Sequence, residues 1–388
     1  MRIAIVGCGY VADFYKATLS NYPGLELLGV FDRNPERASR FAQYHQTHQY
    51  DHIDALLGDE RVEMVLNLSN PRSHFEVSRA ALLAGKHVYS EKPLAMTMDE
   101  AQELVRLCEE RGLYLSAAPC NVLGESAQTL WQKLREERIG KVRLVYAEVD
   151  DGMIFRTHFR KWISDSGAPW PYKDEFEIGC TMEHAGYCLT WLAAFFGPAK
   201  SITSFAACLV PDKVPGEQLN RIAADFSVAC IEYHSGVVAR VTCSLIAAHD
   251  HRFRVVGDEG VLETEDTWNY GSPVYLRKDS SPLRQRLSRH RFLARLAALV
   301  KKPIPLVREP SFHHRSRGGG FMDFARGPAE LAEAVQAGRA CRLSARFALH
   351  VTELVLAMES LKGEGGRHML QSTFDPMEPM PWAGDSAK

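Results

Sequence analysis

The chain has 388 residues, with 46 lysines and arginines against 48 aspartates and glutamates. This length exceeds what one hydrophobic core usually supports, so we expect two domains. The nearly balanced charge gives no global field for nucleic acid or for an anionic membrane, and we expect neither as a partner.

Nine cysteines are scattered along the chain without a CxxC pair. This usage predicts no zinc or other metal site and no disulfide framework, and it is typical of reduced thiols in a cytoplasmic protein. The first apolar strand begins at residue 2, so we expect no signal peptide, and no apolar run reaches membrane-spanning length.

The first 32 residues contain the pattern that a dinucleotide needs. Residues 2–6 are a short apolar run that predicts a buried parallel strand, and Gly7, Cys8, Gly9, Tyr10, Val11 and Ala12 follow it directly. Gly7 allows a tight turn, Gly9 lets the backbone approach a pyrophosphate, and Ala12 lets the next helix pack closely on the sheet. The helix would begin at Tyr10 and Val11, with its first amides facing the phosphates.

An acid ends the second strand, which we expect over residues 25–31. Asp32 can accept hydrogen bonds from both adenosine ribose hydroxyls, and its charge repels a 2′-phosphate. Arg33 complicates the choice, because a guanidinium at the ribose can pair with the phosphate of NADP. We favour NAD over NADP. A glycine turn that serves packing alone would explain the glycines but not Asp32.

Strand and helix signals alternate up to about Val149, which predicts a doubly wound parallel sheet, and we place the NAD(P)-binding domain at residues 1–122. We expect strands at 62–68, 86–89 and 114–118, and helices at 74–84 and 98–110. Ligands bind at the carboxyl ends of parallel strands, so these ends supply the further cofactor candidates. They are Ser69, Asn70, His74, Glu91, Lys92 and Asn121.

After Gly140 the sequence is rich in strands without intervening helices. We expect these at 142–149, 201–208, 223–233, 237–245, 253–256 and 261–264. Such runs predict an antiparallel sheet and therefore an α+β second domain over residues 123–388. Helices at 321–337 and 344–361 close the chain and are expected to pack back on the first domain.

Three motifs together resemble one family. The first is the glycine-rich turn with its acid, the second is Gly85 to Ala95 with its central Glu91-Lys92-Pro93, and the third is the pair Gly257–Glu263 and Arg342–Ala345. The chain is thereby identified as a member of the Gfo/Idh/MocA family (glucose-fructose oxidoreductase, inositol dehydrogenase, rhizopine catabolism). The resemblance implies a Rossmann domain, an open-faced, mostly antiparallel sheet that forms a homodimer or homotetramer, and hydride transfer between nicotinamide and a sugar or cyclitol carbon. It also implies a catalytic Lys92 and a Glu91 that contacts the cofactor.

The chemistry independently favours the lysine. A carbinol that loses hydride must also lose its hydroxyl proton, and a nearby cation stabilises the developing alkoxide. Pro93 fixes the backbone there, and a cis peptide bond would aim Lys92 inward. The alternative is a solvated surface lysine without a catalytic role. The position of Lys92 at the carboxyl end of a strand favours the catalytic role.

The expected partner of that lysine departs from the family pattern. The family helix has an aspartate, a histidine four residues later and another aspartate three residues after that; the aligned places here hold Glu183, Tyr187 and Thr190. These three share one helical face. Tyrosine has a reference pKa of about 10, so acting as a base near pH 7 requires roughly 4 kcal/mol of compensation, part of it from Lys92. His184 is either a substrate contact or a structural residue.

The segment between residues 150 and 179 is long, aromatic and polar. Arg160, Trp162 and Lys173 within it suit a sugar ring and an anion such as a carboxylate or diphosphate. The alternative is an aromatic lid that only packs. A basic amphipathic stretch at 283–302 is expected to be an inserted helix, a subunit contact or a membrane-surface helix, and residues 313–320 a linker.

These features leave three functions open. The first is an NAD(P)-dependent sugar, nucleotide-sugar or cyclitol dehydrogenase. The second is a non-catalytic regulator on the same fold, which would not need a proton-handling pair, and the third is an aldose oxidoreductase that retains its cofactor.

Overall fold

The computed structural model describes residues 1–221, 223–278, 303–312, 321–359 and 366–384. The predicted basic helix at 283–302 and the predicted linker at 313–320 lie outside these residues. Among the helices described, none combines the length and the apolar character that a membrane crossing requires.

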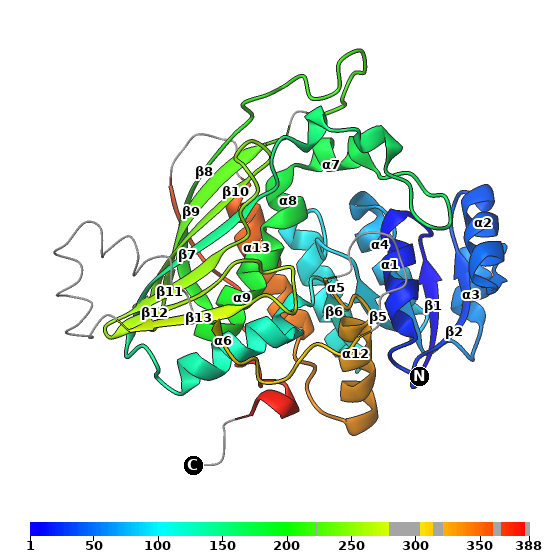
Figure 1. Ribbon diagram of the computed structural model, residues 1–388. Coiled ribbons are helices and arrows are strands. Elements are labelled where there is room, and N and C mark those ends of the chain that lie inside the picture. The colour runs from blue at the N-terminus through cyan, green and yellow to red at the C-terminus, as the bar shows by residue number, and fades with distance from the viewer. Residues whose placement is uncertain (222, 279–302, 313–320, 360–365, 385–388) are drawn as a thin grey trace.

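The N-terminal part is a parallel sheet of six strands in the order β3-β2-β1-β4-β5-β6 (Figure 1). The strands are β1 (Arg2–Val6), β2 (Glu26–Phe31), β3 (His48–Gln49), β4 (Met64–Asn67), β5 (His87–Ser90) and β6 (Leu115–Ala117). The helices between them are α1 (Tyr10–Leu19), α2 (Pro35–His45), α3 (Ile53–Gly58), α4 (His74–Leu83) and α5 (Met98–Glu110). This order places the carboxyl ends of β1, β2, β4 and β5 along one edge, which confirms the predicted Rossmann fold.

The second sheet is large, mixed and mostly antiparallel. Its order is β14-β13-β12-β11-β7-β10-β9-β8-β15. The strands are β7 (Val142–Asp150), β8 (Ala199–Ala207), β9 (Phe226–Tyr233), β10 (Val238–Ser244), β11 (Phe253–Gly257), β12 (Gly260–Thr264), β13 (Val274–Lys278), β14 (Pro303–Ile304) and β15 (Arg367–Met369). The strands β7 and β10 pair in parallel, whereas the other neighbours in this order pair antiparallel.

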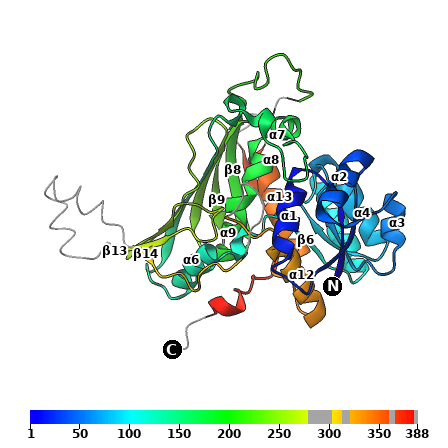
Figure 2. The ribbon, with the colours of Figure 1, turned by 45° about the vertical axis from the view of Figure 1, so that its right-hand side comes forward.

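Helices cover the face of the large sheet that is turned toward the small sheet (Figure 2). They are α6 (Glu125–Arg135), α8 (Cys180–His184), α9 (Gly186–Phe196) and α13 (Ala345–Met358). The helix α13 packs against α5 on one side and α9 on the other, and α12 (Arg326–Ala337) packs on β5 and β6. The closing helices therefore contact the first sheet.

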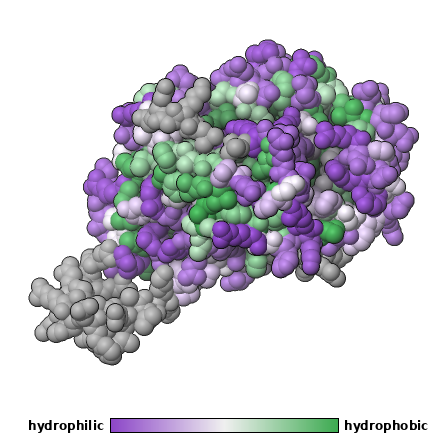
Figure 3. Space-filling view, turned by 90° about the horizontal axis from the view of Figure 1, so that it is seen from above, coloured by the Kyte–Doolittle hydropathy of each residue, from purple (hydrophilic) through white to green (hydrophobic). Residues whose placement is uncertain are grey.

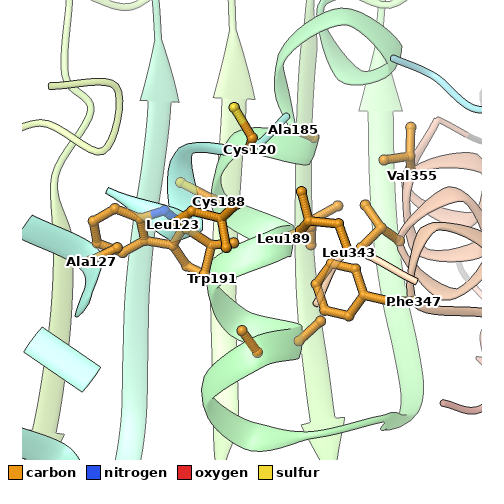
Figure 4. Close-up of a cluster of buried hydrophobic side chains, with 14 of the residues drawn as sticks. Cys120, Leu123, Ala127, Ala185, Cys188, Leu189, Trp191, Leu343, Phe347 and Val355 are labelled. Atoms are coloured by element: carbon orange, nitrogen blue, oxygen red, sulfur yellow. The ribbon is translucent and has the colours of Figure 1, made fainter. Parts of the chain in front are cut away.

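The helix α9 is anchored by apolar side chains on two of its sides (Figure 4). Leu189 lies beside Leu343 and Phe347 of the C-terminal part, while Trp191 points toward Ala127 of α6. Trp191 and Leu189 are fully buried. This packing holds α9, and hence the side chains at its N-terminal end, at a fixed depth between the two sheets.

Seen from above, the surface is mostly hydrophilic, with an apolar area toward its middle (Figure 3). The polar surface agrees with the balanced charge of the sequence.

Candidate active site

The turn after β1 requires glycine at its first glycine position, Gly7, and leaves open space at its second, Gly9. Gly7 has φ +102°, and a Cβ there would lie 2.4 Å from the carbonyl oxygen of Leu68. A Cβ on Gly9 would meet nothing within 4 Å, and no side chain caps the N-terminus of α1. Open space beside an uncapped helix N-terminus fits a pyrophosphate. Ala12 is buried, and Tyr10 and Val11 are half-buried at the start of α1.

Asp32 lies at the end of β2 and points back toward the glycine turn. Its carboxylate accepts hydrogen bonds from the backbone N–H of Cys8, at 2.8 Å, and of Asn34, at 2.8 Å. Arg37 lies 3.6 Å from the same carboxylate, while Arg33 is exposed. The acid is therefore fixed at the carboxyl end of β2, beside the glycine turn.

The loop after β4 is braced internally. His74 is buried, with Nδ1 2.7 Å from the carbonyl oxygen of Pro93 and Nε2 3.0 Å from that of Ser69. Burial lowers the pKa of His74. The structure thus places this predicted cofactor residue between two loops as a brace. The Ser69 hydroxyl donates to Asn67, and the side chain of Asn70 accepts from the N–H of Arg72.

Glu91, Lys92 and Pro93 follow β5, and the Lys92–Pro93 peptide bond is cis, as the sequence suggested. Both carboxylate oxygens of Glu91 accept hydrogen bonds, one from the Tyr15 hydroxyl at 2.6 Å and one from the N–H of Lys92 at 3.0 Å. Glu91 therefore fixes the backbone from which Lys92 projects.

Lys92 reaches across to the second half of the chain, where its Nζ donates to the carboxylate of Glu183 on α8. The two side chains are 18% and 8% exposed. Burial alone would lower the pKa of Lys92, but the nearby carboxylates, Glu183 above all, outweigh it and hold the pKa above its usual value. Burial raises the pKa of Glu183, and the charge of Lys92 opposes this. Lys92 is therefore a protonated cation at neutral pH.

Tyr187 lies one turn beyond Glu183, at the start of α9. Ala185 separates α8 from α9, but its backbone is still helical, so Glu183 and Tyr187 stay on neighbouring faces. Burial raises the pKa of Tyr187 above its usual value, although Lys92 lowers it in part. Lys92 thus supplies some of the compensation expected from the sequence, and burial outweighs it.

Asn121 holds the backbone of Tyr187 in place. Its buried amide donates to the carbonyl oxygens of Tyr187, at 2.9 Å, and Thr267, at 3.0 Å, and accepts from Thr190 at 3.2 Å. The structure therefore places Asn121 and Thr190 as positioning residues for α9. Because the amide is used in these bonds, the predicted cofactor contact of Asn121 has no donor left.

His184 is held between two carboxylates. Its Nδ1 lies 2.6 Å from Asp151 and its Nε2 lies 2.9 Å from Glu175. Burial alone would lower the pKa of His184, but Asp151 and Glu175 outweigh it and hold the pKa well above the usual value. His184 is consequently tied to protein groups, which favours the structural interpretation over a direct substrate contact.

Asp151 also binds His251, a residue that the sequence analysis did not single out. The His251 Nε2 lies 3.0 Å from Asp151, and its Nδ1 lies 3.5 Å from Asp266. Burial lowers the pKa of His251, but these carboxylates outweigh it and raise the pKa to about 9. The ring of Trp268 lies between, 4.5 Å from His251 and 4.4 Å from Tyr187 between centroids.

The three substrate candidates in the segment 151–179, hereafter the bridging segment, do not join this site. Arg160 and Lys173 are exposed, and both pair with Glu217, at 2.9 and 2.7 Å. Trp162 packs on Trp170 at 4.9 Å. In this structure Arg160 and Lys173 share one glutamate that is distant in sequence, and Trp162 packs against another aromatic residue. This arrangement favours the aromatic lid that the sequence left as the alternative, and the substrate contacts of Arg160, Trp162 and Lys173 stay predictions.

The bridging segment is also less irregular than its sequence suggested. It contains the 3₁₀ turns η3 (Ile154–Arg156) and η4 (Phe159–Lys161) and the helix α7 (Tyr172–Ile178). In Figure 1 it passes over the top of the first sheet. Ser166 donates to Asp13 of α1 at 2.7 Å, and Arg72 pairs with Asp174 and Glu177 of α7 at 2.9 and 3.0 Å. It therefore bonds to α1, which follows the glycine turn, and to the loop after β4.

Comparisons with known proteins agree with this geometry. The chain matches a family described as an oxidoreductase family with an NAD-binding Rossmann fold over residues 1–118, and a GFO/IDH/MocA C-terminal domain over residues 127–263. A trans-1,2-dihydrobenzene-1,2-diol dehydrogenase from Mus musculus is 24% identical over 273 residues, which cover 69% of this chain and 75% of that protein.

Two solved structures share the fold over almost their full length. The UDP-N-acetylglucosamine 3-dehydrogenase from Acidithiobacillus ferrooxidans superimposes with a TM-score of 0.68 at 19% identity, covering 93% of this chain and 97% of its own. An aldose-aldose oxidoreductase from Caulobacter crescentus, complexed with glycerol, gives a TM-score of 0.74 at 18% identity. The match covers 95% of this chain and 99% of that protein. The chain belongs to the GFO/IDH/MocA family and is an NAD(P)-binding oxidoreductase.

Proposed function

We propose that this oxidoreductase transfers a hydride between nicotinamide and a hydroxyl or keto carbon of a sugar, a nucleotide sugar or a cyclitol, with Lys92, Glu183 and Tyr187 as its catalytic residues. The observation that carries this proposal is the buried Lys92 cation, held by Glu183 beside the phenol of Tyr187. The two fold relatives named for UDP-N-acetylglucosamine and for aldoses support the substrate class.

Each residue has one task in the reaction. Bound nicotinamide supplies or accepts the hydride. Lys92 donates a hydrogen bond to the substrate oxygen and stabilises the negative charge that develops on it. Glu183 keeps Lys92 charged and oriented. Tyr187 is protonated at neutral pH, as a phenol ordinarily is, and burial raises its pKa further, so it can give its proton to the oxygen during reduction.

The cofactor is proposed to be NAD rather than NADP. The open space at Gly9 and the uncapped N-terminus of α1 would take the pyrophosphate, and Asp32 would accept from the ribose hydroxyls. Ser69, Asn70 and Glu91 remain proposed contacts nearby. We expect NAD to bind more tightly than NADP and Asp32→Ala to reduce the difference in calorimetric titrations. Equal or tighter NADP binding by the unmutated protein would overturn the preference.

The experiment for the reaction is a substrate screen. Free aldoses, inositols and UDP-sugars are incubated with the protein and NAD or NADP, and the absorbance of reduced nicotinamide is followed. We expect one class to react, and Lys92→Ala and Tyr187→Phe each to lower turnover roughly 10²-fold with little change in cofactor affinity. Cofactor binding without turnover on any class would instead support the non-catalytic regulator.

A second candidate function follows from the bridging segment. Its bonds from Ser166 to Asp13 and from Arg72 to Glu177 tie it to α1 and to the loop after β4, which favours slow cofactor release and alternate oxidation and reduction of two sugars. The test is whether nicotinamide stays with the protein through gel filtration. Arg72→Ala should then speed its release.

We also propose a homodimer or homotetramer in the cytoplasm. No helix among the described residues covers the outer face of the large sheet, and Phe205 of β8, the strand next to the edge strand β15, is exposed. Such a face is usually buried by a second subunit. Sedimentation showing a monomer at micromolar concentration would contradict this. All nine cysteines are unpaired, which suits a reducing compartment.

A further inference from the structure

Asp151, His249 and His251, here called the histidine–aspartate cluster, come together from two strand ends of the large sheet. Asp151 directly follows β7, and the two histidines precede β11. One ligand atom from each lies within 4.8 Å of the other two. His251 is buried, Asp151 is half-buried and His249 is exposed. No part of the proposed hydride transfer uses these groups.

The charges around this cluster favour a cation. In the described part of the chain, neither Asp151 nor Asp266 has an ion pair with a lysine or arginine, and their charged neighbours are histidines. Asp150 and Asp250 add two further carboxylates, of which Asp250 is neutralised by Arg252. Among the described residues, the carboxylates of Asp151 and Asp266 are therefore balanced by imidazoles alone.

Several buried atoms here are close to one another but not aligned for hydrogen bonds. Asp151 Oδ2 lies 2.6 Å from His184 Nδ1, yet both atoms lack an aligned partner, and the same holds for Nδ1 of His251. Asp151 and His184 still hold one another as an ion pair. Nδ1 of His251, 3.5 Å from Asp266, is the buried ring nitrogen here whose contact with a carboxylate is loose.

The surroundings of His251 match those of a metal-binding histidine. Metal-bound imidazoles usually donate their other N–H to a carboxylate, which fixes the ring. With Nε2 3.0 Å from Asp151, the opposite Nδ1 of His251 faces Asp266 at 3.5 Å. A ligand nitrogen on one side and an orienting carboxylate on the other is the arrangement expected around an ion.

We propose that Asp151, His249 and His251 bind one transition-metal ion. Two imidazoles and one carboxylate suit Zn²⁺, Mn²⁺, Fe²⁺ or Co²⁺ and do not suit Mg²⁺ or Ca²⁺, which prefer oxygen ligands alone. Ligands at about 2.1 Å from an ion lie at most about 4.2 Å apart, so the exposed His249 needs to move by less than about 1 Å. Three protein ligands leave at least one position for water or a substrate oxygen.

The position of the cluster links it to the reaction centre. The indole of Trp268 contacts His251 on one side and Tyr187 on the other. An ion there would lie one aromatic ring away from the phenol proposed to exchange the proton. Metal binding itself does not depend on the proposed function and is measured without substrate.

The experiment titrates the full chain, treated with a chelator and dialysed, with Zn²⁺ in a calorimeter and with Co²⁺ by visible absorption. We expect one ion per chain, with Co²⁺ bands that report histidine coordination. His249→Ala should weaken binding by at least about 10-fold, and Asp151→Asn should do the same. His249 is exposed, so its variant tests the site even if Asp151→Asn fails to fold.

His234→Ala is the matched control, because His234 is also exposed but lies in the turn between β9 and β10. It should bind both ions as the unmutated chain does. The proposal is overturned if the unmutated chain takes up neither ion stoichiometrically, in which case the cluster is a hydrogen-bonded network only. It is also overturned if His249→Ala and His234→Ala bind alike.

Discussion

Replacing Lys92 by methionine should destabilise the protein by an amount that depends on pH. The substitution keeps the length of the side chain but leaves the carboxylate of Glu183, 8% exposed, without its cation. An unpaired buried carboxylate takes up a proton instead. The ordinary pKa of a glutamate is 4.5. At pH 7 protonation therefore costs about 3.4 kcal/mol, since each pH unit above that pKa costs about 1.36 kcal/mol.

The measurement is the free energy of unfolding in urea at pH 7 and pH 5. We expect Lys92→Met to lose about 3 kcal/mol at pH 7 and only about 1 kcal/mol at pH 5, where the carboxyl protonates readily. The double variant Lys92→Met/Glu183→Gln should recover most of the loss at pH 7. Lys200→Met, at an exposed lysine of β8, is the control and should change little. An equal loss at both pH values, or no recovery in the double variant, would refute the reasoning.

Three further predictions concern groups whose pKa the fold shifts. Because burial raises the pKa of Tyr187 above its usual value, the rate of sugar oxidation should still be rising between about pH 9 and pH 10. In Tyr187→His the rate should reach its plateau near neutral pH. An unchanged pH–rate profile in Tyr187→Phe would exclude the phenol from proton transfer. Burial lowers the pKa of His350 to about 4 from 6.5, so the unfolded chain binds the extra proton between these values. Stability should therefore fall by about 2 kcal/mol from pH 8 to pH 5, and His350→Gln should lose that dependence in urea unfolding. Burial raises the pKa of Glu359 to about 7 from 4.5, so the folded chain holds the extra proton and stability falls as pH rises through this range. Glu359→Gln should gain about 3 kcal/mol at pH 8 and little at pH 4.5, and a loss of thermal stability at pH 8 would count against this account.

The Rossmann half was predictable because its signals are local. The strand, the glycine turn, the helix and Asp32 follow one another within 32 residues. The helix α5 agrees with its predicted bounds, since Thr97 and Glu100 form a reciprocal cap at its start. Such signals depend on neighbours three or four residues away, which the sequence displays directly.

The edge strands of the large sheet were not predicted, because their signals are not local in the sequence. The strands β14 and β15 have two and three residues and pair with β13 and β8 far from them in sequence. Segments this short carry no period of their own, and their pairing partner decides their conformation. The strand β13 and the parallel pairing of β7 with β10 were missed likewise.

Charge pairing over long sequence distances decides which of the predicted site residues the structure brings together. Lys92 was placed by its strand end and Glu183 by the family alignment, and the two do meet. Arg160 and Lys173 have the composition of an anion site, but in this structure both pair with Glu217, which the sequence pattern did not reveal. The group around Asp151 and His251 had a signal that was overlooked, the His-Asp-His triplet at residues 249–251 at the end of a strand-free stretch.

The Lys92–Glu183 pair is better explained by catalysis than by stability. A buried ion pair has to repay the desolvation of both charges, and apolar replacements of similar volume are often as stable or more stable. The pair also joins the end of β5 to α8, so it lies where the two halves of the chain meet over the strand ends. Lys92→Met/Glu183→Leu should therefore be at least as stable as the unmutated protein while its turnover falls roughly 10²-fold. If the pair were only structural, the double variant would be less stable and the turnover of its folded fraction would be unchanged. Retained stability together with lost turnover is therefore the result that assigns the pair to the reaction.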